Sequence, residues 1–194
     1  VKKPVGKELL IMKNGKKQMG NKIEIINYTP SLLEIHIQCK RISKVAFISL
    51  VFFIILSIGG LAMAIISSED GKIFIIPLLI YTASAIYLSR LLLWNSRGKE
   101  VYKISKGQII YYYDYGLFKD NENTRKFNLL TLGVLDKRNN DVHFSLDEIR
   151  TKAKEGNLLI SLDEEDIEST LPIEINTLVQ VIKEVDPKIK DFIL

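Results

Sequence analysis

The residues best suited to chemistry in this sequence are two histidines and a single cysteine: His36, His143 and Cys39. His36 and Cys39 lie three positions apart in the run LLEIHIQC (32–39), whose alternating pattern predicts a half-buried strand. Side chains at positions i and i+3 of a strand point to opposite faces, which argues against a thiolate–imidazole pair. We expect Cys39 to pack as a small hydrophobe, and His143 stands alone in a second strand-like run. The sequence therefore predicts no catalytic residue and no enzyme.

Patterns for metals and cofactors are weak as well. The acidic run 163–166 (DEED) lacks the alternating ligands and the central glycine of a calcium loop, which favours a solvated turn. No His or Cys spacing matches a zinc site. The pair Gly59-Gly60 lies inside a long apolar segment and not in a phosphate-binding loop. We predict no metal site and no cofactor.

Four tyrosines gather in the run QIIYYYDY (108–115). Alternation along a strand places Tyr111, Tyr113 and Tyr115 on one face and Tyr112 on the other. Tyrosine is a good strand former, so the cluster is explained by the strand alone. It also fits a rigid aromatic patch that binds a protein partner, because aromatic side chains are enriched in interface cores. Tyr111, Tyr113 and Tyr115 are thus candidate partner-binding residues.

Two long apolar segments dominate the first half of the chain. Residues 45–67 carry no charge, and residues 73–94 carry only Arg90. A helix of about 20 apolar residues crosses a bilayer core, so residues 45–94 predict a transmembrane helical hairpin. Gly60 and Ala64 form a small-xxx-small step that we expect to face residues 82–85. Because no charge lies at mid-depth, the pattern favours an anchor over an ion pathway.

Basic residues flank both apolar segments, whereas the connecting residues 68–72 (SEDGK) are nearly neutral. The positive-inside rule therefore predicts the inner, cytoplasmic membrane, with both termini in the cytoplasm. Arg90 is close enough to the end of its segment to reach the headgroups, and tryptophan favours the interface. The predicted membrane-interface residues are Lys40, Arg41, Lys44, Arg90, Trp94, Arg97 and Lys99.

The remaining chain forms a polar domain on both sides of the hairpin. Residues 1–22 carry seven lysines and predict a basic, disordered arm. Residues 23–44 supply the first strands of the soluble domain, and residues 98–194 supply the rest. The basic residues concentrate before position 45 and the acidic ones after position 145, a distribution that suits anionic lipid better than nucleic acid.

Several shorter patterns divide residues 98–194. Strands are expected over 101–105, 108–115, 125–137 (with Gly133 at a bulge), 142–145 and 157–162, with a polar turn at 119–123. Ser145 and Glu148 form a capping box that predicts a helix over 146–155, ended by Gly156. A last amphipathic helix runs through Leu178, Val181, Ile182 and Val185, capped by Asn176 or Thr177 and stopped by Pro187.

The order of these elements resembles small bacterial two-helix membrane proteins with a pleckstrin-homology-like domain. The resemblance is carried by VYKISKGQIIYYYDYG (101–116) after the hairpin and by LPIEINTLVQVIKEV (171–185) near the end. It implies a membrane helical hairpin plus an α+β cytoplasmic domain, in which a bent antiparallel sheet is closed by a C-terminal helix. It also implies an adaptor role, and it supplies no catalytic residues. The predicted helix over 146–155 departs from this pattern.

Three functions fit these observations. The first is a non-enzymatic inner-membrane protein whose cytoplasmic domain binds a protein partner or the membrane surface. The second is an immunity protein that protects its cell against a membrane-acting or secreted toxin. The third is a two-helix membrane effector of a bacterial defence system, in which the spans assemble as a homo-oligomer.

Overall fold

The computed structural model describes residues 20–29, 31–66, 75–136, 141–143, 149, 153–163 and 165–193. The chain divides into two compact units. The helical unit consists of Cys39–Gly98 and Asp114–Phe118. The β unit consists of the described residues up to Gln38, of Lys99–Tyr113, and of the chain from Lys119 onward.

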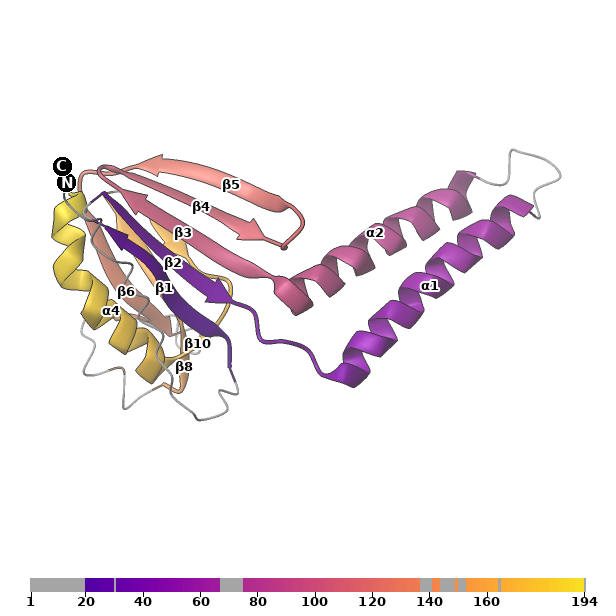
Figure 1. Ribbon diagram of the computed structural model, residues 1–194, viewed down its shortest axis with the longest axis horizontal. Helices are drawn as coiled ribbons and strands as arrows, with labels where there is room; N and C mark the ends of the chain where they lie inside the picture. The colour runs from indigo at the N-terminus through magenta and orange to yellow at the C-terminus, as the bar shows by residue number, and fades with distance from the viewer. Residues whose placement is uncertain are drawn as a thin grey trace, which may run out of the picture. The chain divides into compact units, whose positions relative to one another are not determined.

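The first sheet of the β unit is built from strands on both sides of the apolar segments. Its described strands are hydrogen-bonded in the order β1-β2-β3-β4-β5. β2 and β3 are antiparallel neighbours, although the whole of Cys39–Gly98 separates them in the sequence. The strands are β1 (Lys22–Thr29), β2 (Leu32–Gln38), β3 (Lys99–Ser105), β4 (Gln108–Asp114) and β5 (Lys119–Lys126) (Figure 1).

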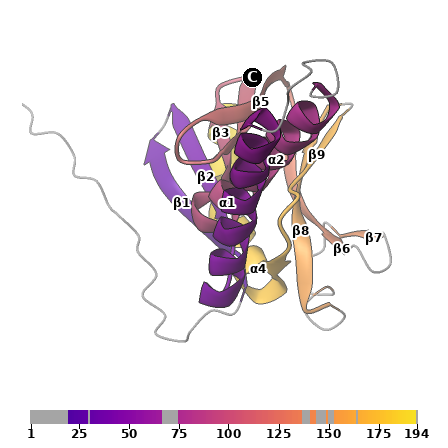
Figure 2. The ribbon, with the colours of Figure 1, turned by 90° about the vertical axis from the view of Figure 1, so that its right-hand side faces the viewer.

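The second sheet contains the strands that follow. Among the described residues its order is β10-β8-β6-β7, and β9 also pairs with β8. β7 lies at the edge, beside β6 (Figure 2). The strands are β6 (Leu130–Asp136), β7 (Asp141–His143), β8 (Glu155–Leu162), β9 (Asp166–Glu168) and β10 (Ile173–Glu174).

Helix α4 (Ile175–Ile189) and the short 3-10 helix η1 (Lys190–Phe192) end the described chain. α4 contacts β1, β6, β8 and β10, and one face of it is buried from Ile175 to Ile189. Alternation along β2 turns Leu33, Ile35 and Ile37 into the core, where each is fully buried. These elements make a mixed α+β fold with mostly antiparallel sheets and a C-terminal helix, as the sequence predicts.

The helical unit contains α1 (Lys44–Ile66) and α2 (Ile75–Arg97), which lie side by side (Figure 1). α2 runs three residues beyond the predicted end at Trp94. Gly60 of α1 lies against the ring of Tyr81 on α2, next to the expected residues 82–85, because a Cβ at Gly60 would lie 2.6 Å from Tyr81 Cε1. The close approach of the helices at this point thus depends on the missing side chain.

Three strand predictions need correction. The polar stretch 119–123, predicted as a turn, belongs to β5, because an edge strand with two largely exposed faces tolerates polar residues on both. Gly133 pairs in regular register with Leu159, and the recorded irregularity lies in β1 between Ile25 and Asn27. The acidic stretch at 163–166 ends in a strand, since Asp166 begins β9.

The helix predictions are correct only in part. Most of residues 146–155, with the capping box, lies outside the described residues, but Glu155 and Gly156 belong to β8, so the predicted helix end is wrong. α4 begins earlier than expected, after Glu174, and neither Asn176 nor Thr177 is its cap. Pro187 lies inside α4, because burial of the flanking Val185 and Ile189 offsets the hydrogen bond that proline cannot donate.

Candidate functional site

The helices α1 and α2 present apolar side chains outward over most of their length. The windows Lys44–Met63 and Leu78–Arg97 are each long and apolar enough to cross a membrane, and 0% of either window is buried within the chain. A helix of 20 residues spans about 30 Å, the thickness of a bilayer's hydrocarbon core. The core helix of a soluble protein would be mostly buried, so these two helices have the exposure that lipid contact requires.

The chain enters and leaves the helical pair through two adjacent segments. The Cys39 N–H donates to the Gly98 carbonyl at 2.9 Å, and the Ile42 N–H donates to the Asn95 carbonyl at 3.4 Å. Ser43 caps α1, since its Oγ accepts the Ala46 N–H at 3.2 Å. These bonds hold the beginning of α1 beside the end of α2.

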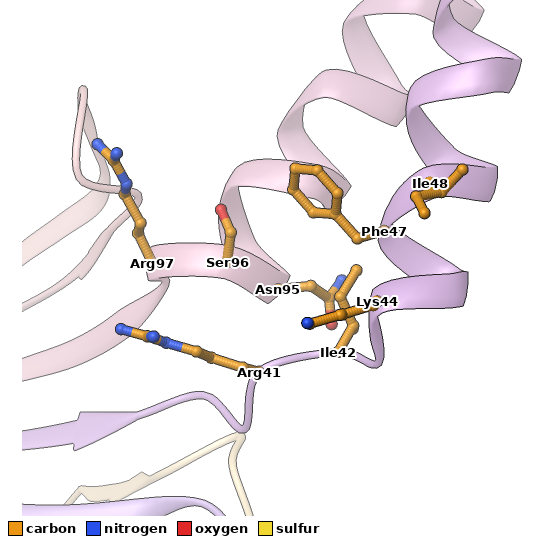
Figure 3. Close-up of a pocket in the computed structure, with 8 residues that line it drawn as sticks. All are labelled: Arg41, Ile42, Lys44, Phe47, Ile48, Asn95, Ser96 and Arg97. Carbon is orange, nitrogen blue, oxygen red and sulfur yellow. The ribbon is translucent and has the colours of Figure 1, made fainter.

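A pocket of about 560 Å³ opens between these two segments (Figure 3). Arg41 and Lys44 line it from the segment that leads into α1. Arg97 lines it from the end of α2, with its side chain extending away from Lys44 (Figure 3). Asn95 and Ser96 add an amide and a hydroxyl. Its apolar lining comes from Ile42, Phe47 and Ile48. The pocket is therefore amphipathic, with cations and neutral hydrogen-bonding groups next to an apolar wall.

Two of the last four carbonyls of α2, those of Trp94 and Asn95, accept backbone hydrogen bonds near this pocket, and two carbonyls one turn earlier accept side-chain hydrogen bonds. The Leu91 carbonyl accepts from Asn95 Nδ2 at 2.8 Å, and the Trp94 carbonyl accepts from the Gly98 N–H at 2.8 Å. The Leu93 carbonyl accepts from Ser96 Oγ at 3.2 Å. These bonds reduce the negative potential that α2 would otherwise direct at an anion in the pocket.

An aromatic cluster lies at the same end of the helical unit. The rings of Tyr115 and Phe118 stack with centroids 4.7 Å apart, and Trp94 of α2 lies 5.2 Å from Tyr115. The Arg90 guanidinium lies over both loop rings, at 5.6 and 5.9 Å. Leu117 projects from the same loop and is 73% exposed. The loop 115–118 thus adds exposed apolar surface beside the basic end of the helices.

The three candidate tyrosines belong to two different units, Tyr111 and Tyr113 to the β unit and Tyr115 to the helical unit. Tyr111 and Tyr113 are half-buried in β4, one residue apart, and share a face with the fully buried Ile109. Tyr111 stacks on Tyr102 of β3, with centroids 6.4 Å apart. Tyr115 follows the end of β4 and belongs to the aromatic cluster of the helical unit. Tyr111 and Tyr113 are therefore the two candidate partner-binding residues that belong to the β unit.

His36 belongs to a polar network across the first three strands. Its Nε2 lies 2.8 Å from Glu34 Oε1, and Glu34 also accepts from Asn27 at 3.0 Å and pairs with Lys103 at 3.5 Å. Burial lowers the pKa of His36 more than the Glu34 carboxylate raises it, which favours the neutral imidazole. Burial would raise the pKa of Glu34, but its hydrogen bonds and the charge of Lys103 lower it instead. These interactions link β1, β2 and β3 within the first sheet.

Glu100 is a buried carboxylate that the sequence analysis did not single out. Its Oε1 accepts the backbone N–H groups of Thr170 and Leu171, each at 3.0 Å, and a hydrogen bond from the Thr170 hydroxyl. Its Oε2 accepts from the Tyr102 hydroxyl at 2.8 Å. Burial raises the pKa of Glu100 despite these donors. The side chain thus links β3 to the segment before β10. The sequence did not predict this link, because a glutamate in a strand-like run gives no sign of its distant partners.

The predicted membrane-interface residues divide between the two units. Arg41, Lys44 and Arg97 meet at the pocket, Arg90 and Trp94 meet in the aromatic cluster, and Lys99 begins β3. Lys40 is exposed just before Arg41. Four residues at this end of the helical unit were not predicted from the sequence: Asn95 and Ser96 at the pocket, and Leu117 and Phe118 in the loop 115–118. The sequence signal for the two loop residues was the apolar turn YGLF after the tyrosines.

Among the described residues, no group of three or more His, Cys, Asp or Glu side chains is arranged to hold a metal ion. Comparisons with protein families, with curated proteins and with solved structures found no match for this chain. The two exposed apolar helices, and the end of the helical unit where basic and aromatic side chains lie, are therefore the features that bear on function.

Proposed function

We propose that this chain is a non-enzymatic integral membrane protein with two spans, whose β unit is a cytoplasmic binding module for a protein partner. One observation carries the proposal: α1 and α2 are long and apolar enough to cross a bilayer, yet 0% of either candidate window is buried within the chain. Lipid is the covering that best matches such a surface. Both helices also satisfy their backbone groups internally, as spanning segments must.

The orientation follows from charge. Arg41, Lys44 and Arg97 gather where the chain enters and leaves the helices, and Trp94 supplies an interfacial aromatic ring beside them. Basic residues favour the cytoplasmic side of a span. In this arrangement the loop 115–118 rests on the cytoplasmic surface of the bilayer, where Leu117 inserts among the headgroups.

The partner surface is proposed on β4. Tyr111 and Tyr113 continue the face that Ile109 and Tyr102 bury, but they remain half-exposed next to the edge strand β5. Aromatic side chains that extend a core face into solvent are suited to bury against a partner. The resemblance to pleckstrin-homology-like membrane proteins supports the same adaptor role.

Two measurements test the anchor and its orientation. The full chain is expected to stay in the membrane pellet after alkaline carbonate extraction, and release into the supernatant would refute integral insertion. In a Cys39→Ser background, a membrane-impermeant maleimide should label Lys106→Cys, an exposed position in the β3–β4 turn, only in inverted vesicles. Labelling in intact cells would refute a cytoplasmic β unit.

Photocrosslinking tests the binding module. A photoreactive residue at Tyr111 or Tyr113 should capture one stoichiometric partner in native membranes, and the same group at the exposed Lys154 serves as the control. A toxin as the partner would favour the immunity function over a scaffold. Crosslinks only between copies of this chain, together with dye leakage on expression, would favour the defence effector and refute the adaptor.

A further inference from the structure

Three cations at the base of the helices have no acidic partner within the described part of the chain. Arg41, Lys44 and Arg97 line one pocket, and all three are exposed. The salt bridges recorded among described residues involve other side chains. The carboxylate of Asp114, in the same unit, accepts the Gly116 N–H at 2.8 Å. All three carry the same charge at the lining of one cavity, so an anion bound there would be attracted by each of them.

The cavity is shaped for an anion that carries an apolar tail. Its volume of about 560 Å³ falls within the range of about 300–1,000 Å³ that is typical of small-molecule sites. The Phe47 ring extends from α1 on the helical side of the pocket, and the Arg41 guanidinium lies on the opposite side (Figure 3). A free inorganic anion would leave Phe47 and Ile48 without a partner. A phospholipid would place its phosphate among the cations and its acyl chains along α1.

The neutral groups at the pocket support the same ligand. Asn95 and Ser96 donate to carbonyls of α2 through Nδ2 and Oγ, which leaves the Asn95 Oδ1 and the lone pairs of the Ser96 hydroxyl oxygen as acceptors on two residues that line the pocket. Hydroxyls of a glycerol-type headgroup can donate to such oxygens. α1 begins at this pocket, so its positive dipole end is directed at the same anion.

We propose that this pocket is a binding site for the headgroup of an anionic phospholipid, with Arg41, Lys44 and Arg97 as the phosphate-binding residues. The inference rests on the proposed function, because it needs the helices to lie in a bilayer. It goes further by assigning a specific, saturable lipid site to the interface, where a general attraction to anionic lipid would need only scattered surface charge.

The test uses the full chain in bilayer nanodiscs that contain equal amounts of phosphatidylglycerol and phosphatidylcholine. After transfer to detergent, native mass spectrometry counts the lipids that remain bound. The double variant Arg41→Gln with Arg97→Gln removes two pocket cations. Its matched control, Lys106→Gln with Lys154→Gln, removes two exposed cations of the β unit and so changes the net charge equally.

The wild type and the control should retain phosphatidylglycerol in preference to phosphatidylcholine. The pocket variant should lose about 5-fold of this preference for each cation removed. Equal preference in the pocket variant and the wild type would overturn the site. Displacement of the lipid by excess inorganic phosphate would overturn the lipid and assign a free phosphate. If carbonate releases the wild type from membranes, the proposed function itself fails; retention in the bilayer without lipid preference refutes only this inference.

Discussion

The contact between Gly60 and Tyr81 makes a sharp prediction about how the two helices pack. An added Cβ at Gly60 would lie 2.6 Å from Tyr81 Cε1 and 2.8 Å from Cζ, closer than carbon atoms can approach. The adjacent Gly59 has no atom within 4 Å of such a Cβ. Gly59→Ala and Gly60→Ala are therefore matched substitutions in one helix that differ in their surroundings.

The magnitude follows from two terms. Replacing glycine by alanine inside a helix stabilises it by about 1 kcal/mol, and this gain applies to both positions. Overpacking a tight contact costs about 1–3 kcal/mol, and this cost applies only at Gly60. We expect Gly60→Ala to be less stable than Gly59→Ala by about 1–3 kcal/mol. Adding Tyr81→Ala should remove most of the difference, because it removes the ring that clashes.

Unfolding in mixed detergent micelles measures these free energies, with the fluorescence of Trp94 as the signal. Trp94 is the only tryptophan, and its ring lies 5.2 Å from that of Tyr115, so its emission should change when the end of α2 loses its contacts. Agreement of the two alanine variants to within about 0.5 kcal/mol would refute the packing argument. So would a Gly60→Ala defect that Tyr81→Ala leaves unchanged.

Four further predictions concern the β unit and the loop beside the helices. Glu100→Ala should lower the free energy of unfolding in urea by about 3 kcal/mol, because it leaves buried N–H donors unpaired. Since burial raises the pKa of Glu100, the wild type should lose part of its stability as the pH rises through that pKa, and Glu100→Gln should lack this loss. Backbone N–H donors lower the pKa of Asp163, so the stabilisation from its carboxylate should be present above the pKa of the unfolded chain and be lost as the pH falls. Asp163→Asn should therefore reduce the loss of unfolding free energy in acid. An unchanged loss in acid would contradict this role of Asp163. In a Cys39→Ser background, an environment-sensitive dye on Leu117→Cys should show a blue shift of its emission when the chain is reconstituted into a bilayer, because Leu117 is exposed in the loop 115–118. The emission of the same dye on Lys106→Cys should not shift. Equal shifts at the two positions would exclude insertion of the loop.

The elements with strong periodicity could be predicted from the sequence. The uncharged length of α1 and the alternation in β2, with Leu33, Ile35 and Ile37 buried, are direct consequences of burial or lipid contact on a regular surface. β5 could not be predicted, because its sequence KDNENTRK is that of a turn. Its strand conformation comes from pairing with β4, and tertiary pairing outweighs local propensity at a sheet edge.

The sequence could predict the kind of candidate site, a basic region beside apolar helices, but not which residues line it together. The positive-inside pattern predicts that Arg41, Lys44 and Arg97 are interfacial, since charge near an apolar span is a local signal. These three cations line one pocket with Asn95 because the segment before α1 lies beside the end of α2, and the sequence alone does not show which segments are neighbours. The same holds for the loop 115–118, whose aromatic rings meet Trp94 only in the folded chain. A sequence pattern does not encode such distances between remote segments.

The topology explains why the cations gather. α1 and α2 are inserted between β2 and β3, which are antiparallel neighbours, and the pairing of Gln38 with Lys99 is followed by the bond from Cys39 to Gly98. The residues that follow β2 and those that precede β3 therefore lie side by side, so the beginning of α1 comes close to the end of α2. The positive-inside rule requires basic residues on each flank of a hairpin with cytoplasmic ends. An insertion of this kind brings two separate basic flanks together, so the pocket that we propose for an anionic headgroup would arise from topology and charge together.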